Sequence, residues 1–229
     1  MIELHDLAGR DPEVRFSPYC WRSRFALAHK ELHVRTIPWR FTDREALAFS
    51  GQGRVPVIRD GEHVVSDSWK IAIYLEREYP DRPSLFGGAV GEAHATFVNS
   101  WADTVLAPAL APLIIVDLFE IIADKDKDYF RSSREQRFGK RLEEVQAGRE
   151  QRLAAFRDLL MPVRRALELQ PYLGGAEPSY ADHIVAGSLM WPYIASRFPL
   201  LETNDRVAGW LSGMRSLYGG LGNILPRAT

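Results

Sequence analysis

Cysteine is almost absent from this sequence of 229 residues, in which Cys20 is the only one. A single cysteine excludes an internal disulfide framework and a metal site built from thiolates. The histidines show no spacing typical of metal ligands, so no metal site is expected. A lone thiol fits a reducing compartment, and we expect a cytoplasmic location.

An excess of one charge is also missing, since 29 Lys and Arg stand against 30 Asp and Glu. No strong attraction to nucleic acid or to an anionic membrane is therefore expected. The most apolar stretch, Val105 to Ile122, is interrupted by two prolines and two acidic residues, whereas a membrane span needs about 20 mostly apolar residues. The start, Met1 to Asp6, lacks the basic stretch and apolar core of a signal peptide.

The first eighty residues alternate strand and helix signals in the order βαβαββα. Ser17 before Pro18 predicts a helix start, and Asp60-Gly61 predicts a tight hairpin turn. The expected strands are Ile2–Leu7, His33–Pro38, Val55–Ile58 and Glu62–Val65, and the expected helices are Ser17–Lys30, Phe41–Phe49 and Asp67–Tyr79.

The proline-rich turn Pro80-Asp81-Arg82-Pro83 is the best domain boundary, and everything after it is predicted to be helical. We expect a first domain over 1–80, a linker over 81–92 and an all-helical domain over 93–229. The expected helical regions are Ala93–Ile122, with a kink near Pro108 and Pro112, then Ser132–Leu167, Tyr180–Arg197 and Val207–Tyr218, with a charged loop over Asp124–Arg131.

Ser17-Pro18-Tyr19-Cys20, after a first strand and at a helix start, places a hydroxyl beside free backbone N–H groups. Such an N-terminus favours an anion, and a thiolate held there would be stabilised in its reactive form. Alternatively, Ser17 is only a helix cap, worth about 1 kcal/mol. This motif alone favours the cap.

Two further positions add to that motif. Val55-Pro56 puts a proline inside a strand-like run, where a cis peptide would free the Val55 backbone for an extended ligand; a trans proline on an edge strand is the alternative. Asp67 and Ser68 at a helix start suit a ligand that carries both an ammonium and a carboxylate, and ordinary capping by Ser66 or Asp67 is compatible with that role.

These positions together resemble the cytosolic glutathione transferases, and the order and spacing fit across the whole chain. Three stretches resemble the bacterial β-etherase-like branch, which cleaves lignin-type aryl ethers, and its fungal serine-type relatives. They are Ser17 to Arg22, Asp67-Ser68-Trp69 through Tyr79 to Pro83, and Glu144 to Glu150. The resemblance implies a thioredoxin-like α/β domain followed by an all-α domain, usually as a homodimer.

The resemblance also implies residue roles. Ser17 would hydrogen-bond the sulfur of glutathione, the cosubstrate, and Val55 before a cis Pro56 would pair with its cysteinyl part. Asp67 and Ser68 would hold the γ-glutamyl end. The glycyl carboxylate would be reached by two residues beside the groove, Gln52 and Arg54.

Ser179-Tyr180-Ala181-Asp182 resembles the capping box of a buried helix in these proteins, although the flanking Pro178 and His183 depart from the usual apolar pair. Cys20 stands where a resolving thiol would lie, but without a partner thiol an inert buried residue is favoured. Asp103 either lies near the glutathione groove or is a solvated helix residue. An aromatic pocket could be lined by Trp101, Phe119, Trp191 and Tyr193, with helical core as the favoured alternative.

The sequence therefore predicts a glutathione transferase in which a Ser17-stabilised thiolate attacks an electrophilic carbon of an apolar, aromatic compound, with aryl ether cleavage as a variant. The alternatives are a glutathione-dependent reductase, against which serine at position 17 weighs, and a carrier of apolar ligands with little turnover. The second substrate depends on helix packing, which the sequence does not specify.

Overall fold

The computed structural model describes residues 1–223, so the last six residues of the expected helical domain lie outside it. The first domain contains a four-stranded mixed sheet in the order β2-β1-β3-β4. Strand β1 (Ile2–Leu7) pairs parallel to β2 (Val34–Trp39) and antiparallel to β3 (Val57–Asp60), which forms a hairpin with β4 (His63–Ser66). The turn between β3 and β4 uses Gly61 with φ +56°, as its Asp-Gly signal predicts.

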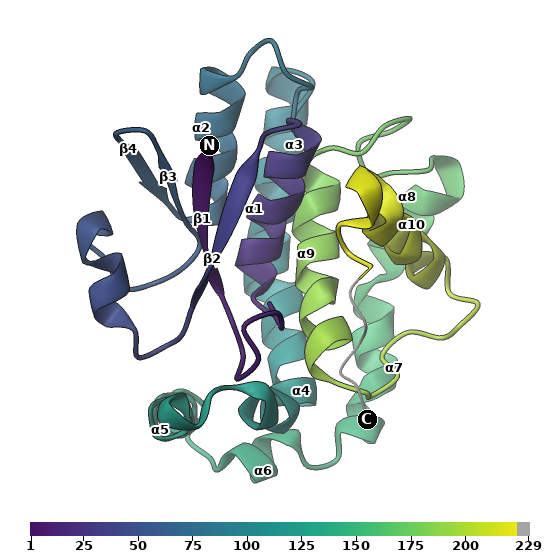
Figure 1. Ribbon diagram of the computed structural model, residues 1–229. Coiled ribbons are helices and arrows are strands. Elements are labelled where there is room, and N and C mark those ends of the chain that lie inside the picture. Colours follow the sequence, from purple (N-terminus) through teal and green to yellow (C-terminus); the bar gives the residue numbers. More distant parts are fainter. Residues whose placement is uncertain (224–229) are drawn as a thin grey trace.

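Two helices join this sheet to the rest of the molecule. Helix α1 (Pro18–His29) lies between the sheet and the helical domain, and α2 (Ser68–Glu78) packs beside it (Figure 1). A short 3-10 helix, η1 (Arg44–Ser50), precedes β3. The expected thioredoxin-like domain followed by an all-helical domain is confirmed.

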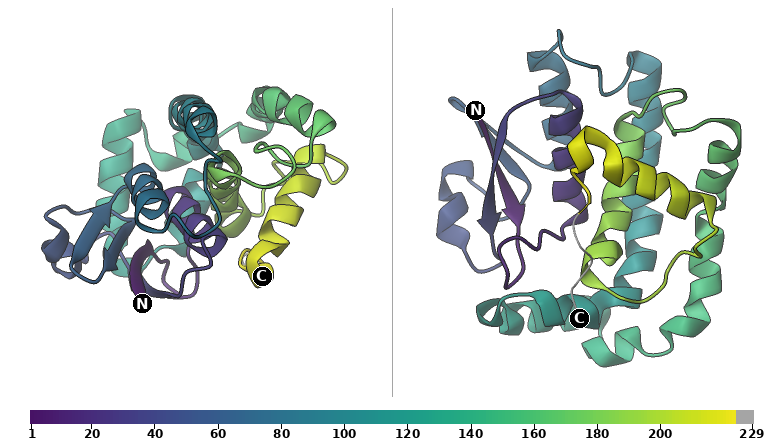
Figure 2. Two further views of the ribbon diagram at one scale, coloured as in Figure 1. Left: turned by 90° about the horizontal axis from the view of Figure 1, so that it is seen from above. Right: turned by 45° about the vertical axis from the view of Figure 1, so that its right-hand side comes forward.

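The helical domain is built around α9 (Tyr180–Ala195), almost all of whose residues are buried. The other helices are α3 (Ala89–Trp101), the π-helical η2 (Ala102–Leu106), α4 (Ala107–Ile121), η3 (Asp124–Asp126), α5 (Lys127–Phe138), α6 (Leu142–Gln146), α7 (Arg149–Leu159), α8 (Met161–Leu169) and α10 (Arg206–Gly220). Figure 2 shows how α10 and α8 flank α9 on the side away from the sheet.

The capping box at the start of α9 is confirmed. Ser179 accepts from the backbone, and Asp182 accepts from the Ser179 N–H at 2.9 Å. Asp182 is fully buried and also accepts from the N–H groups of Leu173 and Gly174 and from the Trp210 indole. These extra donors fix the helix start despite the unusual flanking residues.

Three expectations about the helices need correction. The segment Asp124–Arg131 is η3 and the start of α5 rather than a loop. The region Ser132–Leu167 is divided among four helices. Gly139 and Gly148, both with φ +66°, separate α5, α6 and α7, and Leu160, two residues before Pro162, separates α7 from α8. Helix α3 begins at Ala89, so part of the expected linker is helical. The kink expected near Pro108 is a π-helical turn, η2, which ends shortly before that proline.

The continuous helical stretch Ala89–Ile121 is long and apolar enough to cross a membrane by length and composition alone. Core helices of globular proteins meet the same criterion. Here the stretch packs against α9, α6 and α7, and Leu110, Leu113 and Ile114 belong to the hydrophobic core. We therefore interpret it as a core helix.

Candidate functional site

Ser17 is the N-cap of α1, in extended conformation directly before Pro18. Its Oγ accepts a hydrogen bond from the Cys20 N–H at 3.3 Å, and its side chain is nearly buried. Because the oxygen acts as acceptor toward the helix, the hydroxyl proton can be donated to a ligand. Cap and ligand donor are therefore compatible roles for this residue.

The loop before β3 exposes backbone groups near the start of α1. The Val55–Pro56 peptide is cis. Among residues 1–223, no hydrogen bond engages the Val55 N–H or C=O. The Gln52 amide is used within the loop, where its Oε1 accepts from the Arg54 N–H at 2.7 Å and its Nε2 donates to the Arg54 carbonyl at 2.6 Å. Gln52 thus shapes the loop, while the exposed Arg54 side chain remains available.

Asp67 is the N-cap of α2 and has φ +80°, a sparsely populated value for a residue other than glycine. Its N–H donates to the Pro56 carbonyl at 3.2 Å, which ties this helix start to the cis-proline loop. One carboxylate oxygen accepts from the Trp69 and Lys70 N–H groups, at 3.0 and 3.1 Å. The second oxygen has no partner within residues 1–223 and can accept from an ammonium.

The helical domain reaches this site at two points. The Tyr180 hydroxyl donates to the Ser68 carbonyl at 2.7 Å. Arg22, which is 1% exposed, forms an ion pair with Asp103 at 2.9 Å and also donates to Asn99 at 2.9 Å. Asp103 is thus an interdomain ion-pair partner whose side chain remains 35% exposed.

The Tyr19 ring lies next to Ser17 and stacks over the Arg22 guanidinium, 4.7 Å from the ring centroid. Burial, the Asp103 carboxylate and, more weakly, the Asp67 carboxylate raise the pKa of Tyr19, while Arg22 and Arg137 lower it. The phenol therefore remains a neutral donor at the junction of the two domains. The sequence motif predicted no role for Tyr19 or Arg22. Their spacing of three residues on a helix nevertheless predicts that the two side chains contact each other.

Cys20 is fully buried. Burial, followed by the nearby Asp6 carboxylate, raises the pKa of the Cys20 thiol well above its usual range. A thiol that stays protonated and inaccessible is a poor nucleophile. The structure supports the reading of Cys20 as an inert core residue.

Helix α5 is attached to the first domain at Phe41, whose ring centroid lies 6.4 Å from that of Phe16, the residue before Ser17. Asp126, fully buried, accepts from the Phe41 and Thr42 N–H groups at 3.2 and 3.0 Å and from the Thr42 hydroxyl at 2.7 Å. An ion pair between Lys125 and Asp43 adds to this attachment. Sequence reasoning assigned this segment to a loop and missed its contact with the site.

The four aromatic residues Trp101, Phe119, Trp191 and Tyr193 are partly buried and pack against the hydrophobic core. Within residues 1–223, no ring contact joins any two of them. The structure thus favours the core alternative. No group of three or more His, Cys, Asp or Glu among these residues is placed to hold a metal.

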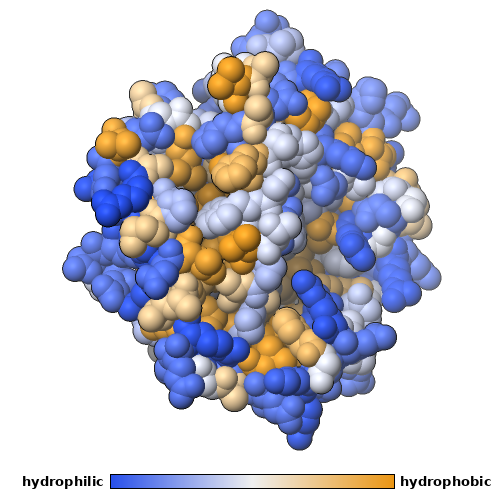
Figure 3. Space-filling model, turned by 180° about the vertical axis from the view of Figure 1, so that it is seen from behind, coloured by the Kyte–Doolittle hydropathy of each residue, from blue (hydrophilic) through white to orange (hydrophobic). Residues whose placement is uncertain are grey.

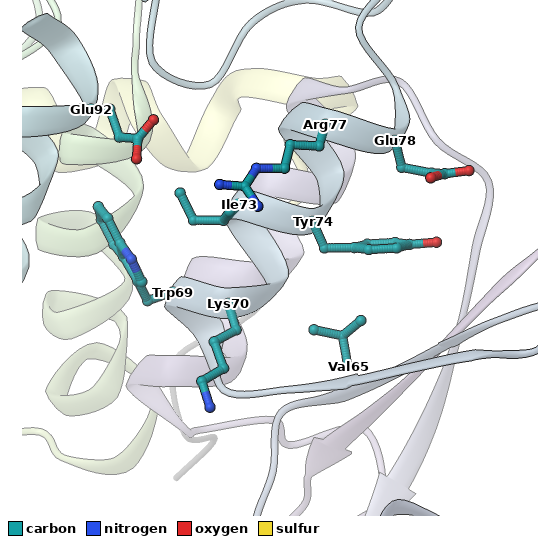
Figure 4. Close-up of a pocket in the computed structure, with 8 residues that line it drawn as sticks. All are labelled: Val65, Trp69, Lys70, Ile73, Tyr74, Arg77, Glu78 and Glu92. Atoms are coloured by element: carbon teal, nitrogen blue, oxygen red, sulfur yellow. The ribbon is translucent and has the colours of Figure 1, made fainter. Parts of the chain in front are cut away.

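A separate pocket of about 540 Å³ lies on the outer face of α2, away from Ser17 (Figure 4). Its apolar wall is formed by Val65, Trp69 and Ile73, and charged side chains including Glu92 of α3 surround it. It is a shallow surface feature, and the hydroxyl, free backbone groups and carboxylate described above all lie elsewhere. We place the candidate active site at Ser17.

Comparison with known proteins gives a consistent result. A family model described as "Glutathione S-transferase, N-terminal domain" matches residues 16–78, and one described as "Glutathione S-transferase, C-terminal domain" matches residues 93–217. A zeta-class glutathione S-transferase of Euphorbia esula is 32% identical over 111 residues, or 46% of this chain and 47% of that protein. The glutathione S-transferase-like protein ustS of Aspergillus flavus is 28% identical over 56% of this chain and 50% of that protein. The matched segments span about half the length of these relatives.

Solved structures resemble the chain over nearly all of its length. Glutathione transferase GSTFuA3 of Phanerochaete chrysosporium superposes with a TM-score of 0.83 at 26% identity, covering 93% of this chain and 95% of that one. A glutathione S-transferase of Ceriporiopsis subvermispora, solved in complex with glutathione, also gives 0.83, at 24% identity and 99% coverage of both chains. At this level of identity, the similarity to the Ceriporiopsis structure shows that the two proteins share a fold.

Proposed function

The chain belongs to the glutathione S-transferase family, and from this premise we propose that it is an enzyme that joins glutathione to an apolar, aromatic electrophile. The proposal places the glutathione sulfur at Ser17, the cysteinyl backbone at Val55 and the γ-glutamyl end at Asp67 and Ser68. Its main support is the Ser17 hydroxyl, which caps α1. The Val55 backbone before the cis Pro56, unpaired within residues 1–223, supports it further. The complex of the Ceriporiopsis protein with glutathione supports the choice of thiol.

In this mechanism Ser17 and the first turn of α1 stabilise the thiolate. The hydroxyl donates to the sulfur, and the helix N-terminus contributes its partial positive charge. The thiolate then attacks an electrophilic carbon, a carbon–sulfur bond forms, and the leaving group departs with its electron pair. Tyr19, next to Ser17 and neutral, supplies a second hydroxyl on the side of the incoming substrate.

We further propose membership of the β-etherase-like or fungal serine-type branch and a cytoplasmic location. In the aryl-ether variant the attacked carbon is adjacent to a ketone, and an aryloxide leaves. The stretches of the sequence that resemble this branch, such as Ser17 to Arg22, support the assignment. A dithiol reductase is disfavoured because Cys20 is fully buried.

Substitution of Ser17 tests the assigned role. Ser17→Gly removes the hydroxyl but keeps most of the capping energy, whereas Ser17→Ala removes both. We expect conjugation of 1-chloro-2,4-dinitrobenzene at pH 7 to fall sharply in both variants, and the rate–pH profile to shift upward by about one pH unit, which corresponds to roughly 1.4 kcal/mol of lost thiolate stabilisation. Glutathione binding, measured by calorimetry, should remain.

Unchanged turnover in Ser17→Gly would remove the basis of the mechanism. Ligand binding without any conjugate in the wild-type protein would instead favour a carrier of apolar compounds. Release of a phenol from a model β-aryl ether ketone, measured by chromatography, separates the aryl-ether variant from general conjugation.

We also propose a homodimer that covers the face shown in Figure 3. Apolar side chains gather in the middle of that face. On α3, Val90 and Phe97 are 86% and 72% exposed and lie two helical turns apart on one stripe. The pocket on α2 offers an apolar wall of matching character, so a two-fold arrangement can place α3 of each copy against α2 of the other.

Phe97→Glu should convert this dimer to a monomer, because it puts a charge on the exposed apolar stripe of α3. Size-exclusion chromatography with light scattering measures the mass directly. Leu169→Glu, at an equally exposed apolar residue on α8, is the matched control and should leave the mass unchanged. A wild-type protein that elutes as a monomer at micromolar concentration would contradict the dimer.

A further inference from the structure

Unpaired arginines gather where α5 meets the loops of the first domain. No carboxylate within residues 1–223 forms an ion pair with Arg44, Arg54, Arg134 or Arg137. By contrast, Arg131 on the same helix pairs with Glu135 and Glu143. An accumulation of cations without acidic partners is unfavourable unless an anion is bound there.

The contacts of these arginines show that they border one aromatic surface. The Arg134 guanidinium lies 5.1 Å from the Phe41 ring centroid and 4.7 Å from that of Phe130. Arg44 lies 6.0 Å from the ring centroid of Tyr129, which is itself 6.0 Å from that of Phe41. An aromatic surface edged by guanidinium groups suits a flat ring that carries a negative group.

A ring contact connects this surface to the thiol site, because the Phe41 ring centroid lies 6.4 Å from that of Phe16, the residue before Ser17. Arg134 borders Phe41, and Arg137 follows Arg134 by one turn of α5. Burial lowers the pKa of Arg134, which the charges of Arg137 and Arg54 also lower, and Arg137 lowers the pKa of Tyr19. The positive region therefore borders the aromatic surface that reaches the segment before Ser17.

Glutathione does not account for all of this charge. Of its two carboxylates, one is assigned to Ser68 at the start of α2 and the other to Arg54. Arg134 and Arg137 remain without an assigned anion. The attachment of α5 through Asp126 holds both arginines in place.

We propose, building on the proposed function, that the second substrate is an aromatic electrophile bearing a carboxylate, and that Arg137, assisted by Arg134, binds this carboxylate. The substrate ring rests against the aromatic surface of Phe41 and Tyr129. Its reactive carbon lies toward Ser17 and Tyr19. The site thus selects aromatic acids over their neutral esters.

A matched pair of electrophiles tests this selectivity. At saturating glutathione, 4-chloro-3-nitrobenzoate and its methyl ester undergo the same substitution: the thiolate bonds to the ring carbon, the carbon–chlorine bond breaks and chloride leaves. The wild-type protein should show a lower KM for the acid. In Arg137→Gln the ratio of the acid KM to the ester KM should rise about tenfold, as for loss of one charge-assisted hydrogen bond.

Lys140→Gln is the control for general electrostatic attraction, because Lys140 is an exposed cation just beyond α5. It should leave the ratio unchanged. Equal KM values for acid and ester in the wild-type protein, or an equal ratio in Arg137→Gln, would overturn the proposal. An increase in the Kd for glutathione in Arg137→Gln that matches the increase in acid KM would also overturn it, since the arginine would then serve the tripeptide.

Calorimetric binding of 4-chloro-3-nitrobenzoate in the presence of S-methylglutathione separates this inference from the proposed function. Arg137-dependent binding in this titration, together with no conjugate when glutathione replaces the S-methyl analogue, would support the anion site and contradict the transferase activity. Conjugation of the ester and of 1-chloro-2,4-dinitrobenzene without preference for the acid would support the activity and contradict the anion site.

Discussion

At the scale of single residues, helix capping and ligand binding use different atoms of the same side chain. The Ser17 oxygen accepts from the Cys20 N–H, which leaves the hydroxyl proton. One Asp67 oxygen accepts two backbone N–H groups, which leaves the other oxygen. Ser17 and Asp67 can therefore each cap a helix and bind a ligand at the same time. Both roles can be predicted from the sequence.

Asp67→Asn separates the two roles. Asparagine caps helices as well as aspartate and tolerates positive φ, so the start of α2 should persist. The missing charge removes the partner of the γ-glutamyl ammonium. We expect the Kd for glutathione to rise about tenfold, the equivalent of roughly 1.4 kcal/mol, with the midpoint of thermal unfolding almost unchanged.

Calorimetric titration measures the affinity, and Asp81→Asn, an exposed substitution in the linker turn, is the control. An unaltered Kd in Asp67→Asn would mean that the free carboxylate oxygen does not contact the tripeptide.

At the scale of elements, α1 and α9 pack more closely than a β-carbon at position 187 would allow. A Cβ at Gly187 would lie 2.8 Å from the Pro18 carbonyl oxygen and 2.9 Å from the Arg22 N and Cγ. The α9 backbone thus approaches the first turn of α1, directly beside Ser17. The glycine serves both the interdomain contact and the geometry of the candidate site.

Gly187→Ala should destabilise the protein by about 1–3 kcal/mol, the usual cost of overpacking. It should also reduce conjugation, because the backbone around Ser17 must shift. Chemical denaturation and the dinitrobenzene assay measure the two effects.

Gly213→Ala is the matched comparison, and we expect it to raise the stability that Gly187→Ala lowers. No atom lies within 4 Å of a Cβ built on this glycine in α10. There alanine should stabilise the helix by about 0.5–1 kcal/mol. Equal effects at the two positions would contradict the close-approach argument.

Element boundaries were predicted well where a local signal was read correctly. Ser17-Pro18, Asp60-Gly61 and Ser179 to Asp182 mark starts and turns that the structure contains. Gly139 and Gly148 carried an equally local stop signal that was overlooked. The ion pair between Arg22 and Asp103 could not be predicted, because 81 residues separate the partners and only tertiary packing joins them.

At the scale of the whole molecule, a partly buried chain of hydrogen bonds links the two domains. His29 Nε2 donates to the Ser84 carbonyl at 3.0 Å, so its Nδ1 must accept from the Tyr218 hydroxyl, at 2.9 Å. Tyr218 then accepts from His183 Nε2 at 3.0 Å. His183 Nδ1 is left buried without a partner within residues 1–223, so a second proton on that ring has no acceptor.

Acidification should therefore weaken the fold. Burial lowers the pKa of His183 well below 6.5, and burial lowers that of His29. Both rings are neutral when folded, whereas the unfolded chain takes up protons below about pH 6.5, so stability falls as pH decreases through that window. One such histidine contributes a loss of about 1.4 kcal/mol between pH 7.5 and 5.5.

His183→Gln should be less stable than the wild-type protein at pH 7.5 but lose less of its unfolding free energy at pH 5.5. The comparison with wild type cancels the opposite contributions of Asp6 and Asp182, whose pKa values are raised by burial. The exposed His94→Gln is the control. Parallel pH profiles for His183→Gln and the wild type would show that this histidine does not titrate on unfolding.

The hydroxyl of Tyr180 holds the main-chain oxygen of Ser68, and Ser68 is the first residue of α2. A fragment cut at the proline-rich turn would lose that support and would expose the apolar sides of α1 and α2. A minimal fragment that binds glutathione should therefore retain α9. Evolution by exchange of second domains would likewise have to carry this tyrosine along.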